Sequence, residues 1–223
     1  MPDETRSVRA LSMSRRPRDR YRSFGDLASV ELEGYDFRRE MCTRPSTIAV
    51  VAIHGGGIEP GASEVARAVA GEDMAWYCFE GIKPRANGTL HVASTRFDDP
   101  QCVTLAARSD LVFSVHGSEG DDPHVLVSGL AEDLVLQLID ALVVQGFCAA
   151  RDCGACAGTD PRNICNRGRL GKGLQIEMSR GLRLTLFRGL SRRDRRVILP
   201  SFHHFAETIR SVLMPCAGGL TIA

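Results

Sequence analysis

The 223-residue sequence lacks any long hydrophobic run. No stretch approaches the roughly 20 apolar residues that a membrane-spanning helix needs, and the N-terminus has no apolar core of a secretory signal. Charges of the two signs nearly cancel, with 28 Lys and Arg against 27 Asp and Glu, so no general attraction to nucleic acid or membranes is indicated. These absences predict a cytoplasmic protein without a membrane partner, released, if at all, on cell lysis.

Cysteine is too scarce for a disulfide scaffold, with eight residues in the whole chain. Four cysteines lie in or beside apolar runs and are expected to be small buried hydrophobic residues: Cys42, Cys78, Cys102 and Cys148. Cys153 and Cys156 form a C-x-x-C pair, but no second pair exists to complete a four-cysteine metal site. We interpret this pair as loop thiols, with an incidental disulfide or a redox function as the alternatives.

One domain is expected. The composition, 43% hydrophobic and 25% charged, is typical of a globular domain with a full core. Residues 1–22 hold seven arginines, few apolar residues and no periodicity, which predicts a disordered basic leader. A basic arm for nucleic acid is the alternative for this leader. Residues 23–223 would then form the folded domain, in which no internal repeat is found.

Predicted strands and helices alternate along this domain. Short apolar or β-branched runs predict strands at 47–53, 75–79, 89–93, 111–115, 124–128 and 147–150, and another that ends near Glu177. Helices are expected at 24–30, 63–70, 100–108, 132–144 and 201–214, and a further one begins at Arg180. The alternation predicts an α/β fold, a single domain with a mixed, mostly parallel sheet that has helices on both faces.

The stretch Val50–Gly61 is the most informative, because an apolar run ends there in a histidine, three glycines and a glutamate. His54 would lie at the carboxyl end of a strand, where open α/β sheets bind their ligands. The glycines permit backbone angles that other residues resist, so the chain can fold back and bring Glu59 beside His54. An imidazole and a carboxylate on one turn can bind the same zinc ion. A phosphate held by the glycines at the start of the next helix is the alternative.

The same pattern recurs where the apolar run 110–115 ends in His116 and Gly117. Three protein ligands with an open position for water are typical of a catalytic zinc site, whereas structural sites are closed by four. The predicted zinc ligands are therefore His54, Glu59 and His116. Glu177, at the end of a further strand, is the predicted general base for the zinc-bound water. A structural role for the histidines is the alternative, and spacing alone does not separate the two.

Several motifs follow one another in an order that is known from one family. The first is His54–Glu64, which reads HGGGIEPGASE. Others lie at 79–83, 90–100, 114–117, 163–168 and 175–183. Across residues 22–214 the sequence therefore resembles the poly-γ-glutamate hydrolase family, found in bacteria and their phages. The resemblance implies an α/β fold like that of zinc carboxypeptidases, with a His, Glu, His zinc triad and a glutamate base.

Carried over to this sequence, the triad of the family falls on His54, Glu59 and His116 and its base on Glu177. The resemblance thus implies a zinc-dependent enzyme that hydrolyses γ-glutamyl amide bonds of a polyanionic substrate. The same zinc chemistry on another N-acyl amino acid or peptide is the first alternative. A nucleic-acid-binding protein, based on the leader and the arginines at 192–196, is the second and is disfavoured because no nucleic-acid motif is recognised.

Arginines are the natural partners of such a substrate. A γ-linked glutamate polymer carries one free carboxylate per unit, and guanidinium groups bind carboxylates through paired hydrogen bonds. We therefore expect Arg162, Arg167 and Arg180 in the substrate cleft, with Asn163 beside them in a motif of the family. His91, in another motif, is expected near the metal as a substrate-binding residue, with a core histidine as the alternative.

Overall fold

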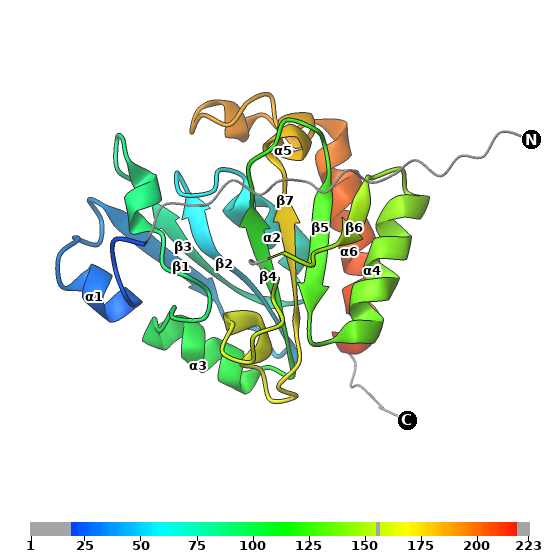
Figure 1. Ribbon diagram of the computed structural model, residues 1–223, viewed down its shortest axis with the longest axis horizontal. Helices are drawn as coiled ribbons and strands as arrows, with labels where there is room; N and C mark the ends of the chain where they lie inside the picture. The colour runs from blue at the N-terminus through cyan, green and yellow to red at the C-terminus, as the bar shows by residue number, and fades with distance from the viewer. Residues whose placement is uncertain (1–18, 155–156, 218–223) are drawn as a thin grey trace, which may run out of the picture.

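The computed structural model describes residues 19–154 and 157–217 (Figure 1). Its strands are β1 (Phe37–Cys42), β2 (Ile48–Gly56), β3 (Ala75–Gly81), β4 (Leu111–Gly117), β5 (Val125–Gly129), β6 (Ala149–Arg151) and β7 (Leu174–Met178). They form one seven-stranded sheet in the order β1-β3-β2-β4-β7-β5-β6. Only the β1–β3 and β5–β7 pairs in it are antiparallel. The predicted α/β domain with a mixed, mostly parallel sheet is therefore confirmed.

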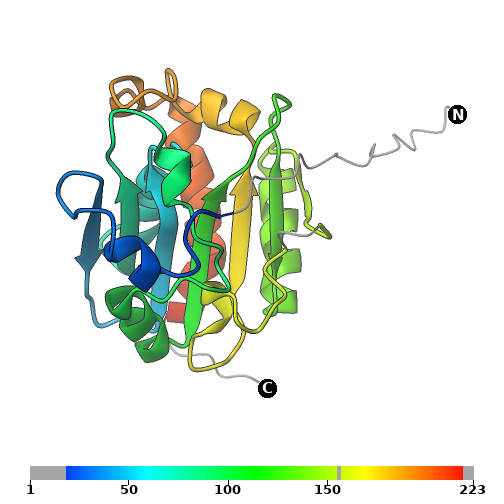
Figure 2. The ribbon, with the colours of Figure 1, turned by 60° about the vertical axis from the view of Figure 1, so that its left-hand side comes forward.

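Helices cover both faces of this sheet, as Figures 1 and 2 show. One face carries α2 (Ala62–Ala70), α4 (Glu132–Val144), α5 (Arg180–Leu186) and α6 (Pro200–Ala217). The other carries α1 (Phe24–Ala28) and α3 (Pro100–Arg108). Short 3-10 helices lie in the connections at η1 (Asn87–Leu90), η2 (Ile164–Asn166) and η3 (Asp194–Arg196). None of the helices in the described ranges is long and apolar enough to cross a membrane.

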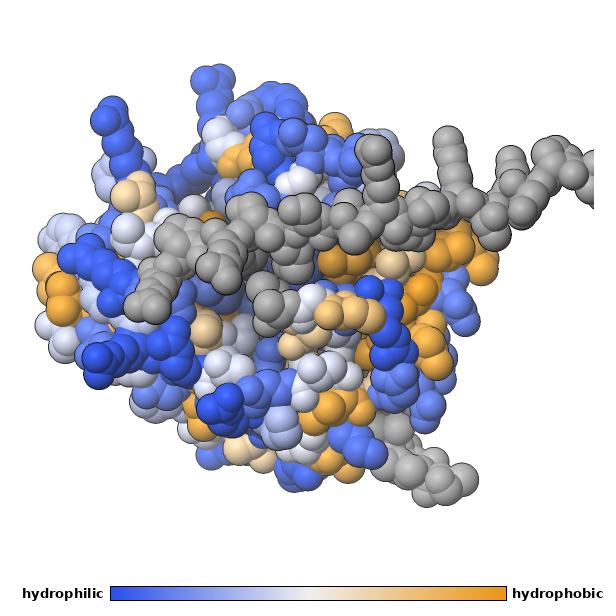
Figure 3. Space-filling view, in the orientation of Figure 1, coloured by the Kyte–Doolittle hydropathy of each residue, from blue (hydrophilic) through white to orange (hydrophobic). Residues whose placement is uncertain are grey.

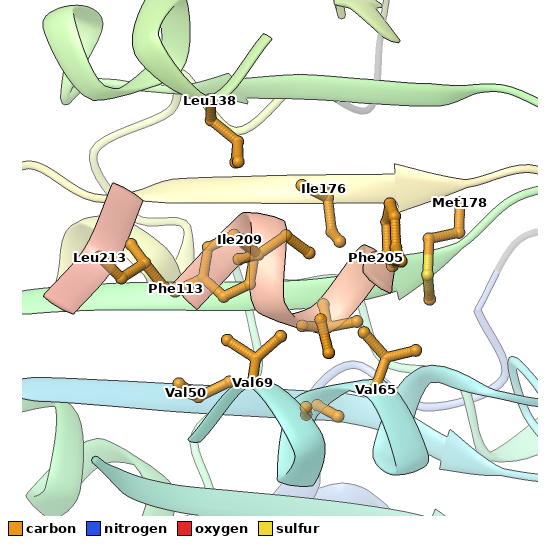
Figure 4. Close-up of a cluster of buried hydrophobic side chains, with 14 of the residues drawn as sticks. Val50, Val65, Val69, Phe113, Leu138, Ile176, Met178, Phe205, Ile209 and Leu213 are labelled. Atoms are coloured by element: carbon orange, nitrogen blue, oxygen red, sulfur yellow. The ribbon is translucent and has the colours of Figure 1, made fainter. Parts of the chain in front are cut away.

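Two hydrophobic clusters, one on each face, hold these layers together. Successive side chains of a strand point to opposite faces, so Val50 of β2 joins the cluster under α2 and α6 while Val51 joins the cluster under α3. Figure 4 shows side chains of α2 and α6 meeting those of β2, β4 and β7 in the first cluster. Because β2 and β4 are buried along their whole length, their sequences are almost continuously apolar.

The folded domain begins earlier than the sequence predicts. Tyr21 is only 5% exposed, and the Asp19 carboxylate accepts a hydrogen bond from the backbone N–H of Ala93. The last four residues of the expected leader therefore belong to the domain, because an aromatic ring and a carboxylate in this arginine-rich stretch both find partners there. Residues 1–18 lie outside the described residues.

Two strand predictions need correction. Residues 89–93 do not form a strand, since the chain turns through η1 and then runs on without a ladder partner. β1 was not predicted, because three charged residues in succession follow its one buried residue, Phe37. Arg38 and Arg39 of this edge strand pair with Glu80 and Asp99, which gives the strand a polar sequence.

The cysteines also differ in part from the prediction. Cys78 and Cys102 are buried as expected, but Cys42 is only half-buried. Cys148, in the turn before β6, is exposed, because that turn lies at the edge of the sheet. Cys153 is exposed as well, and its C-x-x-C partner lies outside the described residues.

Because β2 and β3 approach closely at Gly56, we expect a side chain at this position to lower the free energy of unfolding. A Cβ atom at Gly56 would lie 2.5 Å from the Gly81 carbonyl oxygen, and φ is +65°. Gly146 also has a positive φ, +85°, but open space around it. Gly146→Ala should cost about 1–2 kcal/mol of unfolding free energy from backbone strain, and Gly56→Ala at least about 2 kcal/mol more. Urea unfolding of both variants measures this, and equal losses would contradict the crowding at Gly56.

Candidate metal centre

The candidate site lies where β2, β4 and β7 end, at the upper edge of the sheet in Figure 1. β2 carries one extra residue relative to β3 between Ala52 and Gly55. A bulge of this kind re-aims the side chains around it. The ring of His54, just inside the bulge, lies 5.0 Å from that of His116 and is 2% exposed.

The glycine-rich turn after β2 folds the chain back on itself. The Gly57 N–H donates to Gly81 O at 2.9 Å, and the Glu59 N–H donates to His54 O at 2.8 Å. This brings Glu59 Oε1 to 3.2 Å from His54 Nδ1. The other carboxylate oxygen, Oε2, accepts from the Gly117 N–H at 2.9 Å. One carboxylate therefore joins the ends of β2 and β4.

Two imidazole nitrogens and one carboxylate converge at this point. His54 Nδ1 lies 3.1 Å from His116 Nδ1, and His116 Nδ1 lies 3.4 Å from Glu59 Oε2. Ligands bound tetrahedrally to zinc at its usual distances are about 3.3–3.6 Å from one another. The spacing of the three side chains, and their two nitrogens and one carboxylate, thus fit a zinc ion without large rearrangement.

The outer nitrogens of both rings have partners of their own. His54 Nε2 is 2.9 Å from Val92 O, and His116 Nε2 is 2.8 Å from Ser114 Oγ. A carbonyl oxygen can only accept, so Nε2 of His54 carries a proton, and in the neutral ring Nδ1 then has the lone pair that a metal needs. Such outer hydrogen bonds orient metal-binding imidazoles.

His91 lies against the same cluster. Its ring stacks on His54 with a centroid distance of 3.9 Å, and its Nε2 is 3.9 Å from Glu59 Oε1. His54, Glu59 and His91 offer ligand atoms that all lie within 4.8 Å of one another. The structure therefore places His91 beside the candidate metal centre, and not in the hydrophobic core.

Asp19 holds His91 from the outside, which the sequence analysis missed. Its Oδ1 is 2.6 Å from His91 Nδ1, and its Oδ2 accepts from the Ala93 N–H and from Arg96. Burial raises the pKa of Asp19, but the hydrogen bond and charge of His91, with Ala93 and Arg96, bring the pKa below its usual value. The available signal was a lone acidic residue in an arginine-rich stretch.

Glu177 lies next to His116 on the neighbouring strand. The two residues are partners in the parallel register of β4 and β7, and Leu126 of β5 is the partner on the other side. Residues paired in this way present their side chains on the same face of a sheet. Glu177 is 4% exposed, so its carboxylate shares the buried edge of the site.

Two of the predicted substrate-binding residues, Arg167 and Asn163, form hydrogen bonds within the protein. The Arg167 guanidinium donates to the carbonyl oxygens of Thr95 and Phe97, at 3.0 and 2.9 Å. Asn163 is buried and donates to Gln175 Oε1 at 3.0 Å. Both residues thus tie the chain around η2 to its neighbours, and their contact with substrate stays a prediction.

The other two predicted arginines are exposed. Arg162 pairs with Asp160 at 2.7 Å, and Arg180 pairs with Asp121 at 2.6 Å. Exposed ion pairs of this kind contribute only about 0–1 kcal/mol. Either guanidinium can therefore exchange its partner for another carboxylate at little cost.

Arg183 was not singled out, although it stands at the end of a motif in the sequence. It is 3% exposed and donates to Pro60 O at 2.9 Å and to Ser118 O at 2.6 Å. These carbonyls belong to the turn after Glu59 and to the loop after β4. Arg183 thus joins the turn that carries Glu59 to the loop that follows the strand of His116.

These features define an α/β protein with a candidate metal centre of histidine and glutamate at the carboxyl edge of its sheet. The family model described as poly-gamma-glutamate hydrolase matches residues 21–208. The chain belongs to this family, as the order of its motifs indicates.

Relatives and solved structures agree with this assignment. The chain is 36% identical to UPF0714 protein YndL of Bacillus subtilis (strain 168) over 194 residues, which cover 86% of this chain and 76% of YndL. It is 33% identical to YmaC of the same organism over 199 residues, 87% of this chain and 84% of YmaC. A bacteriophage poly-gamma-glutamate hydrolase superposes with a TM-score of 0.85 at 31% identity, covering 88% of this chain and 97% of that one. A zinc-free apo structure of YndL gives 0.84 at 35%, covering 88% and 98%.

From the contact between Asp19 and His91 we predict an effect of Asp19 on metal affinity. Asp19→Asn removes the charge that holds His91 against the ring of His54. A metal ion bound at this centre should then be held about 10-fold more weakly, as loss of an outer partner of a metal site causes. Competition with a chromophoric chelator measures the affinity. Asp98→Asn is the matched control. Asp98 accepts hydrogen bonds from the N–H groups of Phe24 and Gly25, shortly after Asp19 in the chain, but among the described residues it has none with His91. Equal weakening by both variants would mean that Asp19 acts only by docking the segment.

Proposed function

We propose that this protein is a zinc-dependent hydrolase that cleaves γ-glutamyl amide bonds in poly-γ-glutamate. The observation that carries the proposal is the convergence of His54, Glu59 and His116 at the spacing of zinc ligands. Membership of the poly-gamma-glutamate hydrolase family supports the substrate. The description of one related structure as zinc-free supports the metal.

His54, His116 and Glu59 would hold the ion through two Nδ1 atoms and one carboxylate. When bound, zinc supplies Lewis-acid chemistry that lowers the pKa of a water and polarises a carbonyl group. His91 is the rival for the third position, but its Nε2 is 3.9 Å from Glu59, farther than His116. We therefore assign His91 to the wall of the site that faces the substrate.

Glu177 is the proposed general base. It lies beside His116 on the same face of the sheet, where its carboxylate can take a proton from the attacking water. The same group can then return this proton to the leaving amine nitrogen. Placement on a central strand, between β4 and β5, fixes the position of its backbone relative to the histidines.

Arg162 and Arg180 are the proposed carboxylate-binding groups. Both are exposed, and their present partners are exposed or half-buried aspartates that a substrate carboxylate can replace. Each γ-linked unit carries one carboxylate, so two arginines suffice to fix the direction of the chain. This would align the scissile amide with Glu177.

A second candidate function is hydrolysis of a different N-acyl amino acid or peptide by the same residues. Three exposed acidic residues in the loop after β4 favour it, because they would repel a polyanion that passed near them: Glu119, Asp121 and Asp122. Rates on a panel of γ-linked and α-linked glutamyl peptides separate the two. Faster cleavage of α-linked or uncharged substrates would favour the second candidate.

The metal assignment predicts the zinc content of purified variants. Wild-type protein should carry about one zinc per chain, since its three donors match a zinc site. His54→Ala and His116→Ala should each lose it, whereas His91→Ala should keep it with reduced affinity. Elemental analysis after dialysis measures this. Loss of zinc in His91→Ala with retention in His116→Ala would move the third ligand to His91.

The base assignment predicts a separation of zinc binding from turnover. Glu177→Gln should keep its zinc but lose about 10²- to 10⁴-fold in turnover of poly-γ-glutamate, because the amide cannot accept the proton. The matched control is Glu119→Gln, the same change on an exposed loop residue. Release of new amine groups measures the rate. A fully active Glu177→Gln enzyme would remove this residue from the base role.

A further inference from the structure

We propose that the segment between α5 and α6 carries a second binding site for the polyanionic substrate, outside the metal centre. This deepens the proposed function and rests on it for the identity of the ligand. Residues 188–196 contain five arginines and one acidic residue. We call these residues the arginine loop.

The arginine loop is an ordered structure. Its two ends are joined, since the Arg188 N–H donates to Val197 O at 3.0 Å and the Leu199 N–H donates to Leu186 O at 2.9 Å. Ser191 and Asp194 close its tip through mutual hydrogen bonds of 2.6 and 3.1 Å. A fixed loop presents its charges in one arrangement, which reduces the entropy lost on binding.

The five arginines divide into two groups. Arg195 is 7% exposed and bonds Glu64 at 2.7 Å, and Arg188 pairs with Asp194 at 2.8 Å. The three others are exposed, as the paired Arg188 also is: Arg192, Arg193 and Arg196. Arg192 donates to the Ile82 carbonyl oxygen. No side-chain hydrogen bond of Arg193 or Arg196 is found to the residues that the structure describes, so their guanidinium groups face solvent with donors to offer.

The arginine loop lies next to the turn that carries Glu59. Arg195 bonds Glu64 of α2, which directly follows the Glu59–Gly61 turn, and Arg192 bonds the residue after β3. In Figures 1 and 2 the segment between α5 and α6, drawn in orange, lies at the edge of the sheet where β2, β4 and β7 end. Figure 3 shows a hydrophilic surface at this upper edge. The Arg195–Glu64 contact therefore joins the arginine loop to the helix that follows the Glu59 turn.

A polymer with a carboxylate on every unit can use both places at once. Each exposed guanidinium–carboxylate contact is weak, but contacts on one chain add, and they hold the polymer near the metal centre. A short fragment that fills only the metal centre gains nothing from the loop. The loop therefore acts on long substrates, and salt should screen its effect.

The test compares Arg193→Gln/Arg196→Gln with wild type on long poly-γ-glutamate and on short γ-glutamyl oligomers. We expect KM for the long polymer to rise about 5-fold at low ionic strength, with kcat unchanged and short oligomers unaffected. Added salt should remove the difference. The control, Arg108→Gln/Arg169→Gln, makes the same charge change at the opposite edge of the sheet, and its KM should stay within about 2-fold of wild type.

Three results would overturn the second site: an unchanged KM for the long polymer, an equal loss on short oligomers, or an equal loss in the control. Anisotropy of labelled poly-γ-glutamate bound to Glu177→Gln protein measures binding without turnover. If the wild type cleaves no γ-glutamyl bond but binding still weakens in Arg193→Gln/Arg196→Gln, the proposed function fails and the second site stands. Duplex DNA that binds through these two arginines while polymer binding is unchanged would overturn the site in favour of nucleic acid.

Discussion

The Glu59 carboxylate is the contact on which the site depends. One of its oxygens faces His54 at the end of β2, and the other accepts from Gly117 and faces His116 at the end of β4. A buried carboxylate is costly unless it is paired and hydrogen-bonded, and here its partners come from two strands. The register of β2 and β4 therefore fixes the distance between the two histidines.

Several side chains around this contact fix the backbone of the neighbouring loops through hydrogen bonds. The segment 91–97 supplies Val92 O to His54 and is itself held by Asp19 on one side and Arg167 on the other. Arg183 holds the turn after Glu59 and the loop after β4 in the same way. The backbone of these loops does not form the hydrogen bonds of a β-sheet. Side chains satisfy its polar groups instead: Arg167 and Arg183 donate to carbonyl oxygens, and Asp19 accepts from an N–H group. This gives the site a rigid frame on an edge made of loops.

The central strands of the sheet can be predicted from the sequence, whereas the edge strand β1 and the contacts of Asp19 cannot. Continuous apolar runs identify β2 and β4, and histidine followed by glycine marks where each strand ends, because both signals are local. The edge strand β1 was missed because ion pairs such as Arg38 with Glu80 replace its apolar residues. The pairing of Asp19 with His91 joins residues 72 positions apart, and no local pattern predicts such a contact. The zinc and base roles of the site residues stay predictions.

Arginine shows most clearly what a sequence cannot decide. Arg162 and Arg167 lie five positions apart in one loop, yet one is paired at the surface and the other donates to interior carbonyls. The difference follows from the neighbours that the fold supplies, since a guanidinium with five donors binds any carbonyl or carboxylate within reach. Of the buried arginines, Arg183 donates to two backbone carbonyls, and Arg195 donates to one backbone carbonyl and to Glu64. Arginines with donors to spare lie at the surface, and the second site is proposed on Arg193 and Arg196 because the fold leaves both exposed. The number of arginines in the sequence does not reveal which of them are so placed.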